Sequence, residues 1–415
     1  MSAGLALYRL LTTAAEPLAG PVLRGRARRG KEDAARIAER LGHASLPRPA
    51  GPLVWLHAAS VGESQSILPL IERLRSERPD IAVLVTSGTV TSAALLAQRL
   101  PVGVLHQFAP VDGPRVARRF LDHWRPDVAV FVESELWPNL LRGAKARGTK
   151  LALLSARITQ ESARGWMRAP GAAKALLGGF DVVMAQDSAS EARLKVLGAR
   201  TAGLANLKLV GEPLTCDPRQ LAALREAAGK RPIVLAASTH PGEEETIASA
   251  LPWGALLVVA PRHPERGESV TASLQMMNLA TARRSTAEPL TADTQAYVAD
   301  TLGEMGLLFA LADVAVMGGS FAPGIGGHNP LEPARLGVPV LTGPHVFNFA
   351  EVYDAMIAAD AAVMTPGFEE LGTELETLVT DDARRGVMSH AAKAFAAQGD
   401  VALDATWAKL KPLLP

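Results

Sequence analysis

The chain has 415 residues, a formal net charge of +1 at pH 7 and 48% hydrophobic residues. This length exceeds one typical domain and favours two domains of roughly 200 residues each. The balanced charge gives no general signal for a polyanionic partner, so we expect no nucleic-acid binding. The single cysteine, Cys216, excludes an intrachain disulfide and is typical of a reducing compartment.

Residues 1–45 are predicted to form a helical, basic segment next to a membrane. Residues 5–23 are apolar overall, but they are interrupted by Arg9, Glu16, Pro17 and Pro21. A spanning helix needs ~20 mostly apolar residues, so spanning is not predicted. A basic cluster follows directly, with Arg24, Arg26, Arg28, Arg29 and Lys31. This pattern is typical of peripheral contact with an anionic membrane surface and, equally, of a surface helix with solvated arginines.

Strand-like and helix-like stretches alternate along the first half of the chain. Strands are predicted at residues 53–56, 81–86, 128–132, 151–155 and 181–185. Helices are predicted at residues 64–75 and 92–99, and after the third strand through Lys145. Such alternation predicts a parallel sheet whose crossover connections are right-handed.

The second half repeats this alternation, with strands predicted at residues 232–238, 255–260, 296–298, 314–317 and 339–341. Residues 206–220 contain Gly211, Pro213 and Pro218 and are predicted to be a linker. The sequence thus predicts two doubly wound, Rossmann-like α/β domains, 1–205 and 221–415, that face each other across a cleft. Ligands of open α/β sheets bind beyond the carboxyl ends of the strands.

A candidate site follows the first predicted strand. Glu63 could act as a general base if burial tunes its pKa. However, Ser60 and Glu63 also have the spacing of a capping box, which is purely structural and is the favoured interpretation. Gly62 fits both interpretations. After the second strand, Ser87, Gly88 and Thr89 could hydrogen-bond a ligand, although an ordinary helix-entry turn is favoured.

Two acidic residues follow the third predicted strand. In an extended segment Glu133 and Glu135 point to the same side. Two carboxylates there are costly to bury, so water, basic groups or a substrate should lie nearby. A solvated strand end is the alternative, which the neighbouring Trp137 disfavours. The chain contains no Asp-x-Asp sequence, which argues against a metal-dependent nucleotide-sugar site.

In the second half, His240 and the pair Arg262 and His263 each follow a predicted strand. Arg262 could grip a phosphate with two hydrogen bonds, or form a surface ion pair. The turn at residues 303–306 could wrap a base with backbone groups. Glu332 could accept ribose hydroxyls, or could cap Asn329 reciprocally.

The glycine-rich stretch at residues 318–333 is the most informative feature. It is predicted to form a strand end, a loop containing Gly319 and Ser320, and a helix with Asn329 as its cap and Pro330 as its first residue. A helix N-terminus offers unpaired N–H groups and partial positive charge, which suit a phosphate. We therefore expect a phosphorylated small molecule to bind here.

Five motifs occur in order along the chain, at residues 57–63, 132–139, 206–208, 261–266 and 326–333. Together they resemble the 3-deoxy-D-manno-octulosonic acid (Kdo) transferases of lipopolysaccharide assembly, over nearly the whole chain. The resemblance implies a GT-B architecture whose last helix returns to the first domain. It also implies transfer of Kdo from CMP-Kdo to a lipid A precursor of the lipid IVA type, with inversion and without a metal. CMP-Kdo would be a substrate, so no cofactor is expected.

The resemblance also implies roles for single residues. Glu63 matches the general base, and Glu133 and Lys208 match residues that stabilise the transition state. The positions that match CMP-binding residues are Arg262, His263, Gly303, Glu304, Met305, Asn329, Pro330, Leu331 and Glu332. Ser60, Gly62, Ser87, Gly88, Thr89, Glu135, His240, Gly319 and Ser320 are candidate further substrate contacts.

The expected location is the cytoplasmic face of the bacterial inner membrane, with peripheral or weak anchoring, since many relatives carry a more hydrophobic N-terminal anchor. Two alternatives stay open. One is a GT-B transferase or epimerase that uses another nucleotide sugar, and the other is a non-catalytic glycolipid-binding relative.

Overall fold

The structure is a computed structural model that describes residues 2–415. Contacts divide it into two compact units. The first contains the residues up to Val210 together with Gly399–Pro415, and the second is Gly211–Gln398. The change of unit after Val210 lies within residues 206–220, and the last seventeen residues belong to the first unit.

The first unit is built on a parallel sheet of seven strands in the order β3-β2-β1-β4-β5-β6-β7. The strands are β1 (Leu53–Ala58), β2 (Ala82–Ser87), β3 (Leu105–Phe108), β4 (Val128–Val132), β5 (Lys150–Ala156), β6 (Val182–Ala185) and β7 (Thr201–Leu204). The chain builds outward from β1 to β3 and then returns to the other side of β1 with β4. The strand order therefore reverses between β1 and β4, which is where open α/β sheets bind their ligands.

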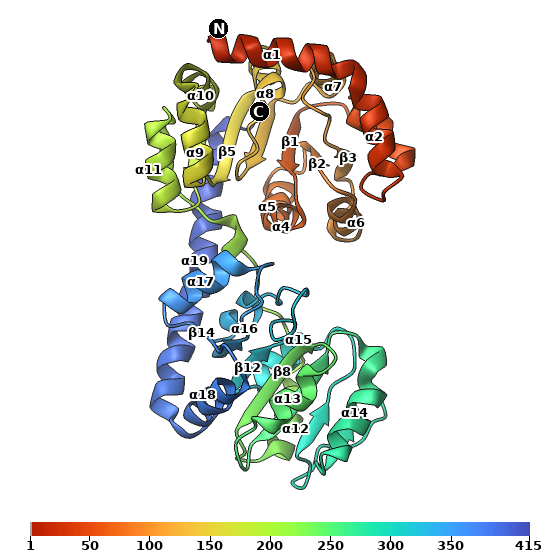
Figure 1. Cartoon of the computed structure of the whole chain (residues 1–415), viewed down its shortest axis with the longest axis vertical. Coiled ribbons are helices and arrows are strands. Elements are labelled where there is room, and N and C mark those ends of the chain that lie inside the picture. The colour runs from red at the N-terminus through yellow and green to blue at the C-terminus, as the bar shows by residue number, and fades with distance from the viewer. Residues whose placement is uncertain (1) are drawn as a thin grey trace. The chain divides into compact units, whose positions relative to one another are not determined.

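Helices surround this sheet, and α1 and α2 run along the outside of the unit (Figure 1). The helices are α1 (Ala3–Ala15), α2 (Ala19–Ala27), α3 (Ile37–Arg40), α4 (Val61–Ser66), α5 (Leu68–Glu77), α6 (Val90–Arg99), α7 (Pro114–Trp124), α8 (Pro138–Lys145), α9 (Gln160–Met167), α10 (Pro170–Leu177) and α11 (Ser188–Val196). Short 3-10 turns are η1 (Glu16–Leu18), η2 (Ala34–Arg36) and η3 (Leu207–Leu209).

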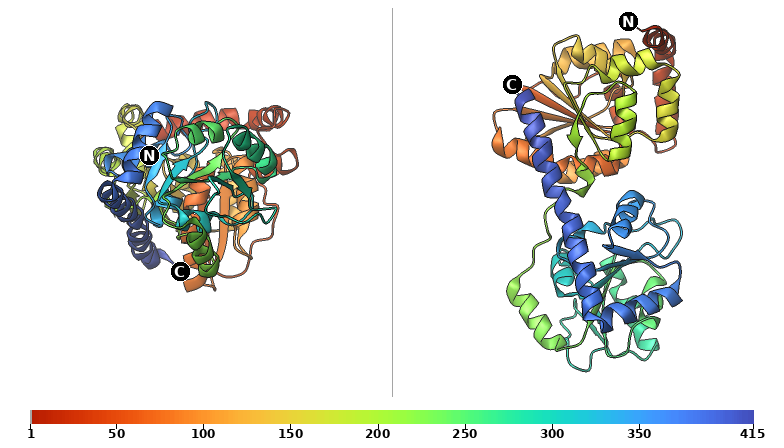
Figure 2. Two further views of the ribbon diagram at one scale, coloured as in Figure 1. Left: turned by 90° about the horizontal axis from the view of Figure 1, so that it is seen from below. Right: turned by 90° about the vertical axis from the view of Figure 1, so that its left-hand side faces the viewer.

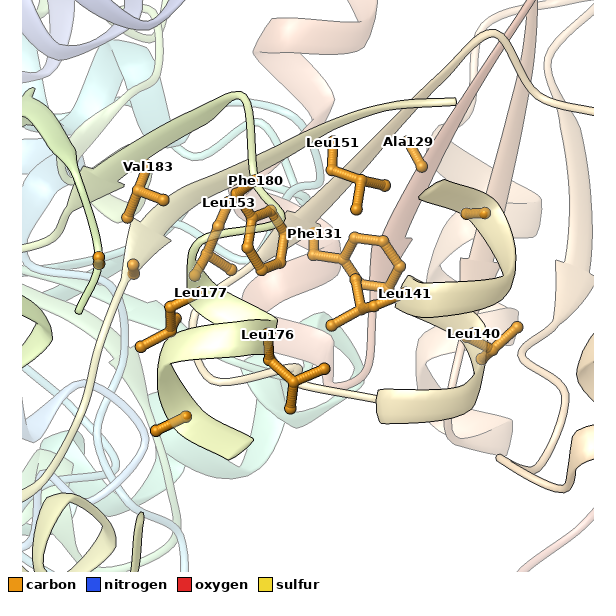
Figure 3. Close-up of a cluster of buried hydrophobic side chains, with 14 of the residues drawn as sticks. Ala129, Phe131, Leu140, Leu141, Leu151, Leu153, Leu176, Leu177, Phe180 and Val183 are labelled. Atoms are coloured by element: carbon orange, nitrogen blue, oxygen red, sulfur yellow. The ribbon is translucent and has the colours of Figure 1, made fainter. Parts of the chain in front are cut away.

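The first sheet is buried on both faces, as the right-hand view of Figure 2 shows. Along β1, Leu53 and Trp55 belong to one apolar cluster and Val54 and Leu56 to another, because successive strand residues point to opposite faces. In the first cluster Phe131 lies among leucines of α8 and α10 (Figure 3). This double burial explains the continuous apolar runs that marked the central strands in the sequence.

The second unit repeats the plan, with a parallel sheet in the order β10-β11-β9-β8-β12-β13-β14. Its strands are β8 (Ile233–Thr239), β9 (Leu256–Pro261), β10 (Thr281–Arg283), β11 (Ala296–Val298), β12 (Val314–Met317), β13 (Val340–Thr342) and β14 (Ala362–Met364). Its helices are α12 (Pro218–Ala228), α13 (Glu243–Ser249), α14 (Gly267–Met276), α15 (Met305–Leu311), α16 (Leu331–Arg335), α17 (Ala350–Ala358), α18 (Phe368–Thr380) and most of α19 (Asp382–Leu410), with η4 (Pro264–Arg266); η5 (Lys411–Leu413) follows α19 in the first unit. Here the strand order reverses between β8 and β12.

The predicted fold class, two doubly wound α/β units of the GT-B type, is confirmed. Every predicted strand exists, and the four unpredicted strands, β3, β7, β10 and β14, are the four sheet edges. Edge strands pair on one side only, and each of these four buries two residues or fewer, so they lack the continuous buried run that identifies a central strand.

The helix predicted at residues 64–75 is wrong in its limits. The structure has two helices, α4 and α5, that meet at Ile67. Pro69 is the second residue of α5. It lacks the N–H that a continuous helix would need there, so the chain begins a new helix instead. Among residues 2–415, none of the helices combines the length and apolarity needed to cross a bilayer.

Candidate functional site

Glu63 lies in the first turn of α4, where its side chain takes part in the helix cap and is nearly buried. Its Oε1 accepts a hydrogen bond from Ser60 Oγ at 2.8 Å and its Oε2 accepts one from the Ala59 N–H at 2.8 Å, while Ser60 Oγ accepts from the Glu63 N–H at 3.3 Å. Ser60 therefore caps α4 as the capping-box interpretation predicts, although the carboxylate of Glu63 returns to the Ala59 N–H and not to the Ser60 N–H. Glu63 is only 7% exposed. Burial raises the pKa of Glu63, and the charges of Glu133 and Glu135 raise it further, against the effect of the two hydrogen bonds.

Glu133 and Lys208 form an ion pair beside this carboxylate. The distance from Lys208 Nζ to Glu133 Oε1 is 2.8 Å. Glu133 directly follows β4 and has a φ of 55°, a left-handed conformation that costs a non-glycine residue roughly 1 kcal/mol or more. Strained backbone of this kind persists where surrounding contacts fix it and is common at functional sites.

Ser155 explains how Lys208 comes to lie near β4. The hydroxyl of Ser155, at the end of β5, donates to the Ala205 carbonyl at 3.0 Å and accepts from the Leu207 N–H at 2.7 Å. These two bonds fix the η3 turn, and the Asn206 side chain caps it by accepting from the Lys208 N–H at 3.1 Å. Residues that are 75 positions apart in the chain are thereby brought into contact.

Glu135 is the third carboxylate of this group and has a different environment. Its Oε2 lies 3.3 Å from His57 Nε2 and accepts a hydrogen bond from the Trp137 indole. Burial opposes ionisation, but the hydrogen bonds and the charge of His57 keep the pKa of Glu135 below its ordinary value. On the other side of His57, Nδ1 lies 2.9 Å from Thr86 Oγ1. The pKa of Glu63 is thus raised while that of its neighbour Glu135 is lowered. Carboxylates whose environments push their pKa values apart are candidates for acid and base roles.

Ser87, Gly88 and Thr89 have structural roles at the entry to α6, as the helix-entry interpretation predicted, and their role as substrate contacts stays a prediction. Ser87 is fully buried, and its Oγ lies 2.8 Å from His106 Nε2. The Gly88 N–H donates to the Ala59 carbonyl at 3.1 Å, and a Cβ at Gly88 would lie 2.9 Å from that oxygen. Thr89 caps α6. By contrast, a Cβ at Gly62 would meet open space.

In the glycine-rich loop of the second unit, two backbone N–H groups are paired within the protein. The carboxylate of Glu243 accepts hydrogen bonds from the Gly319 N–H at 2.7 Å, the Phe321 N–H at 3.0 Å and the His240 N–H at 2.9 Å. Ser320 is fully buried, and its hydroxyl donates to the Met317 carbonyl at 2.6 Å. An internal carboxylate thus accepts from the Gly319 and Phe321 N–H groups, while the phosphate site expected at the start of the following helix stays a prediction.

The helix after this loop is also shorter than expected. It begins at Leu331 rather than Pro330 and has five residues, so its dipole is small. Asn329 Oδ1 accepts from the Leu331 N–H at 3.1 Å, and Asn329 Nδ2 donates to Glu332 Oε1 at 3.4 Å. Asn329 and Glu332 thus contact each other through their side chains, but Pro330 is the N-cap and no reciprocal box forms. The side chain of Leu331 is buried in the core.

Three histidines gather near Arg262 beyond the carboxyl ends of β8, β9 and β12. The Nε2 atoms of His240 and His328 lie 3.1 Å apart and their rings are stacked, with centroids 5.3 Å apart. The ring of His263 lies edge-on to His240, with centroids 6.1 Å apart. Burial, and then the neighbouring positive charges, lower the pKa of His328 to about 4 and also lower that of His240. Arg262 is exposed beside them, so the group is suited to an arriving anion.

The turn at residues 303–306 belongs to a different group of contacts. Gly303 has a φ of 82°, which favours glycine. Glu304 is held by Arg284, with distances of 2.5 Å from Nη2 to Oε1 and 2.6 Å from Nε to Oε2. The hydrogen bond from Arg284 lowers the pKa of Glu304. Among residues 2–415, no group of three or more His, Cys, Asp or Glu side chains is arranged to hold a metal ion.

Comparison with known proteins identifies the family. The sequence profile described as "3-Deoxy-D-manno-octulosonic-acid transferase (kdotransferase)" matches residues 35–211. A 3-deoxy-D-manno-octulosonic acid transferase of Bordetella pertussis is 36% identical, over 85% of this chain and 86% of the relative. The chain belongs to the Kdo transferase family. A probable mitochondrial 3-deoxy-D-manno-octulosonic acid transferase of Arabidopsis thaliana is also 36% identical, over 89% of this chain and 85% of the relative.

The architecture extends beyond the Kdo transferase family. A solved glycosyltransferase structure from Rickettsia africae aligns with a TM-score of 0.52 and covers 88% of this chain and 99% of that one, at 11% identity. At that identity the likeness concerns the fold alone. Membership of the Kdo transferase family makes this protein a glycosyltransferase that transfers Kdo.

The structure adds to this Kdo transferase several residues that the sequence did not single out. His57 and His328 lie inside the motifs at residues 57–63 and 326–333. Their positions, after a strand and after a pair of glycines, could have marked them as candidate site residues. Ser155, Glu243 and Arg284 had no such signal, because each acts on a segment distant in the chain. The first unit brings Ser60, Glu63, Glu133, Glu135 and Lys208 together. In the second, His240 and His263 lie together, and the turn at residues 303–306 is held separately.

Proposed function

We propose that this protein transfers Kdo from CMP-Kdo to a hydroxyl group of a lipid A precursor of the lipid IVA type. The observation that carries the proposal is the convergence of Glu63, Glu133 and Lys208 at the point where the first sheet reverses its strand order. These three residues come from separate segments. They occupy the positions that the family resemblance gives to the general base and to the groups that stabilise the transition state.

The first unit supplies the acid–base chemistry in this proposal. The acceptor oxygen forms a bond to the anomeric carbon of Kdo, and the bond from that carbon to the phosphate oxygen of CMP breaks. Glu63 takes the proton of the acceptor hydroxyl, for which its raised pKa is suited. Lys208 balances charge beside Glu133 as the anomeric carbon develops oxocarbenium character. Attack opposite the leaving group inverts the anomeric centre.

The second unit holds the nucleotide in this proposal. CMP leaves with a dianionic phosphate, and fixed cationic or N–H donors can stabilise that charge without a metal ion. Arg262 together with His240, His263 and His328 is the group suited to this task. We place the phosphate there rather than in the loop at Gly319, whose N–H group is taken by Glu243.

Incubation of the protein with CMP-Kdo and a tetra-acylated lipid A precursor tests the reaction. We expect a product heavier by one or more Kdo units, with CMP released. CMP should also raise the melting temperature, while UDP, GDP and ADP should leave it unchanged. Stabilisation by UDP alone would favour a transferase or epimerase for another nucleotide sugar. CMP binding without any product would favour a non-catalytic glycolipid-binding protein.

We further propose that the helices α1 and α2 dock the enzyme on the cytoplasmic face of the bacterial inner membrane. The inner face of α1 is fixed to the fold through buried Leu5 and through Tyr8, whose hydroxyl donates to Asp112 at 2.9 Å. The outer surface exposes Leu7, Leu10, Leu11, Leu18 and Val22. Exposed basic residues follow: Arg24, Arg28, Arg29 and Lys31. An apolar stripe beside a basic cluster is suited to an anionic bilayer surface.

Replacing Arg24, Arg28 and Arg29 by glutamine should weaken binding to anionic liposomes, with the largest difference at low salt, because each basic residue near such a surface contributes about 1 kcal/mol. Flotation of liposomes measures this binding. Arg26 serves as a contrast, since it pairs with buried Glu32 at 2.9 Å and its loss should lower stability. Flotation that is unchanged in the triple variant would remove the basic cluster from the docking surface.

A further inference from the structure

A cavity of about 620 Å³ opens in the first unit beside Glu135, one of the three clustered glutamates. The proposed reaction gives this cavity no role. One wall is α1, another is the segment that leads from Glu135 into α8, and a third is formed by α9 and α10. The lining residues are Gly4, Leu5, Tyr8, Ser134, Glu135, Leu136, Trp137, Pro138, Ser162, Gly165, Trp166, Ala169 and Ala172.

The lining offers carbon surface rather than hydrogen-bonding groups. Leu136, Trp137, Trp166 and Ala169 are only partly buried and pack on the edge of the core cluster that contains Phe131. Several polar atoms in the wall already have partners within the protein. The Tyr8 hydroxyl donates to Asp112, the Trp137 indole N–H to Glu135, and the Ser134 hydroxyl to the Arg157 carbonyl. An occupant is therefore recognised by apolar contact.

Glu135 connects this cavity to the chemistry. It forms part of the cavity wall, its Oε2 lies 3.3 Å from His57 Nε2, and its charge contributes to the raised pKa of Glu63. A molecule with a hydroxyl at Glu63 and a hydrocarbon segment attached to it can therefore occupy both places. The other side of α1 exposes Leu7, Leu10 and Leu11, so the helix that forms one wall of the cavity also carries apolar side chains on the outside of the unit.

From the apolar lining and the place of Glu135 in the wall, we propose that the cavity binds one fatty acyl chain of the acceptor. The inference rests on the proposed function and adds to it a subsite that selects for acylation. A peptide would bring backbone N–H and C=O groups, and burying these without partners is costly. A chain of methylene groups needs no such partners and can follow an irregular apolar cavity.

Gly165 provides a direct way to fill the cavity. It lies in α9, lines the cavity, and a Cβ added there meets no atom within 4 Å. Gly165→Leu should raise KM for the acylated acceptor about tenfold, which corresponds to about 1.4 kcal/mol. It should leave kcat/KM for a fully deacylated acceptor at the wild-type value. Trp166→Ala removes part of the cavity wall and should also raise KM for the acylated acceptor alone. This second variant keeps the test valid if Gly165→Leu fails to fold.

Gly386→Leu is the matched control, because Gly386 also lies in a helix and a Cβ there also meets open space. This variant should behave as wild type with both acceptors. If Gly165→Leu weakens the two acceptors equally, or neither, the cavity does not hold an acyl chain.

A binding measurement separates this inference from the proposed reaction. Titration with the fluorescent fatty acid cis-parinaric acid should show saturable enhancement with wild type and Gly386→Leu, and at least tenfold weaker binding with Gly165→Leu. Equal binding by all three proteins overturns the acyl site, even if Kdo transfer is observed. Absence of Kdo transfer to either acceptor, with cavity-dependent fatty acid binding intact, contradicts the proposed function instead.

Discussion

Replacing Glu63 by glutamine is expected to lower kcat by ~10²-fold or more, because the variant has no group to take the proton of the acceptor hydroxyl. Binding of CMP should stay near the wild-type level, since the nucleotide is assigned to residues of the second unit. Initial rates of Kdo transfer and a melting-temperature shift with CMP measure the two effects separately. Wild-type turnover in the variant would falsify the assignment of Glu63 as the base.

Glu63 also caps α4, so loss of structure has to be separated from loss of chemistry. Glutamine keeps the size of the side chain, and its one oxygen can accept from the Ala59 N–H, but the acceptor that the Ser60 hydroxyl uses becomes a donating NH2 group. Asp187→Ala is a suitable control, because Asp187 caps α11 by accepting from the Ser190 N–H at 2.6 Å. Its removal should cost about 1 kcal/mol of stability and leave the rate of Kdo transfer unchanged.

The pH dependence gives a second readout of the same residue. Burial and the charges of Glu133 and Glu135 raise the pKa of Glu63 above its ordinary value of 4.5. The base must be ionised to accept a proton, so kcat should fall as the pH drops through this raised pKa. The acid limb of the wild-type profile should therefore lie above that of an ordinary carboxylate, and Glu63→Gln should lose this limb.

The sequence predicted the central strands well because both faces of each sheet are buried. Residues 128–132, 296–298 and 314–317 match β4, β11 and β12 in both limits. The edge strands have fewer buried positions, and two of them, β10 and β14, are only three residues long. Their pairing depends on the neighbouring strand more than on their own composition, so a single sequence carries little information about them.

Glu63, Glu133 and Lys208 were singled out from local motifs, and the structure brings the three residues together. The partner of the Gly319 N–H group could not be predicted in this way. The Gly319 N–H donates to Glu243, which lies 76 residues earlier in the chain. No pattern in the sequence near Gly319 predicts such a distant partner. A glycine-rich loop before a helix therefore indicates close backbone packing, and only the structure tells whether a ligand or an internal carboxylate is the acceptor.

Among the described residues, three of the seven non-glycine residues with a positive φ lie at the carboxyl ends of strands. Glu133 follows β4, Ser155 lies near the end of β5, and Ser238 lies near the end of β8, with φ angles of 55°, 48° and 57°. Two of these residues contribute to the cluster of Glu63, Glu133 and Glu135. Glu133 forms the ion pair with Lys208, and Ser155 fixes η3, which carries Lys208. Local strain is thus concentrated where side chains from separate strands must converge.

Replacing Lys208 by methionine should have an effect of similar size to the loss of the base. The variant keeps the length and most of the apolar stem of the side chain but removes the cation 2.8 Å from Glu133. Loss of one preorganised electrostatic group typically lowers kcat by ~10²-fold or more. Without Lys208, the charge of Glu133 acts unopposed on Glu63 and raises its pKa further, so the acid limb of the kcat profile should move to higher pH.

This shift distinguishes a role in charge balance from a role in holding η3. A purely structural lysine would change the amplitude of the profile and the melting temperature, but not the position of the acid limb. Lys208→Arg restores a cation and should return the limb toward its wild-type position, even if the different geometry of the guanidinium keeps kcat low. A limb that stays in place in Lys208→Met would mean that Glu133 does not influence the protonation of Glu63.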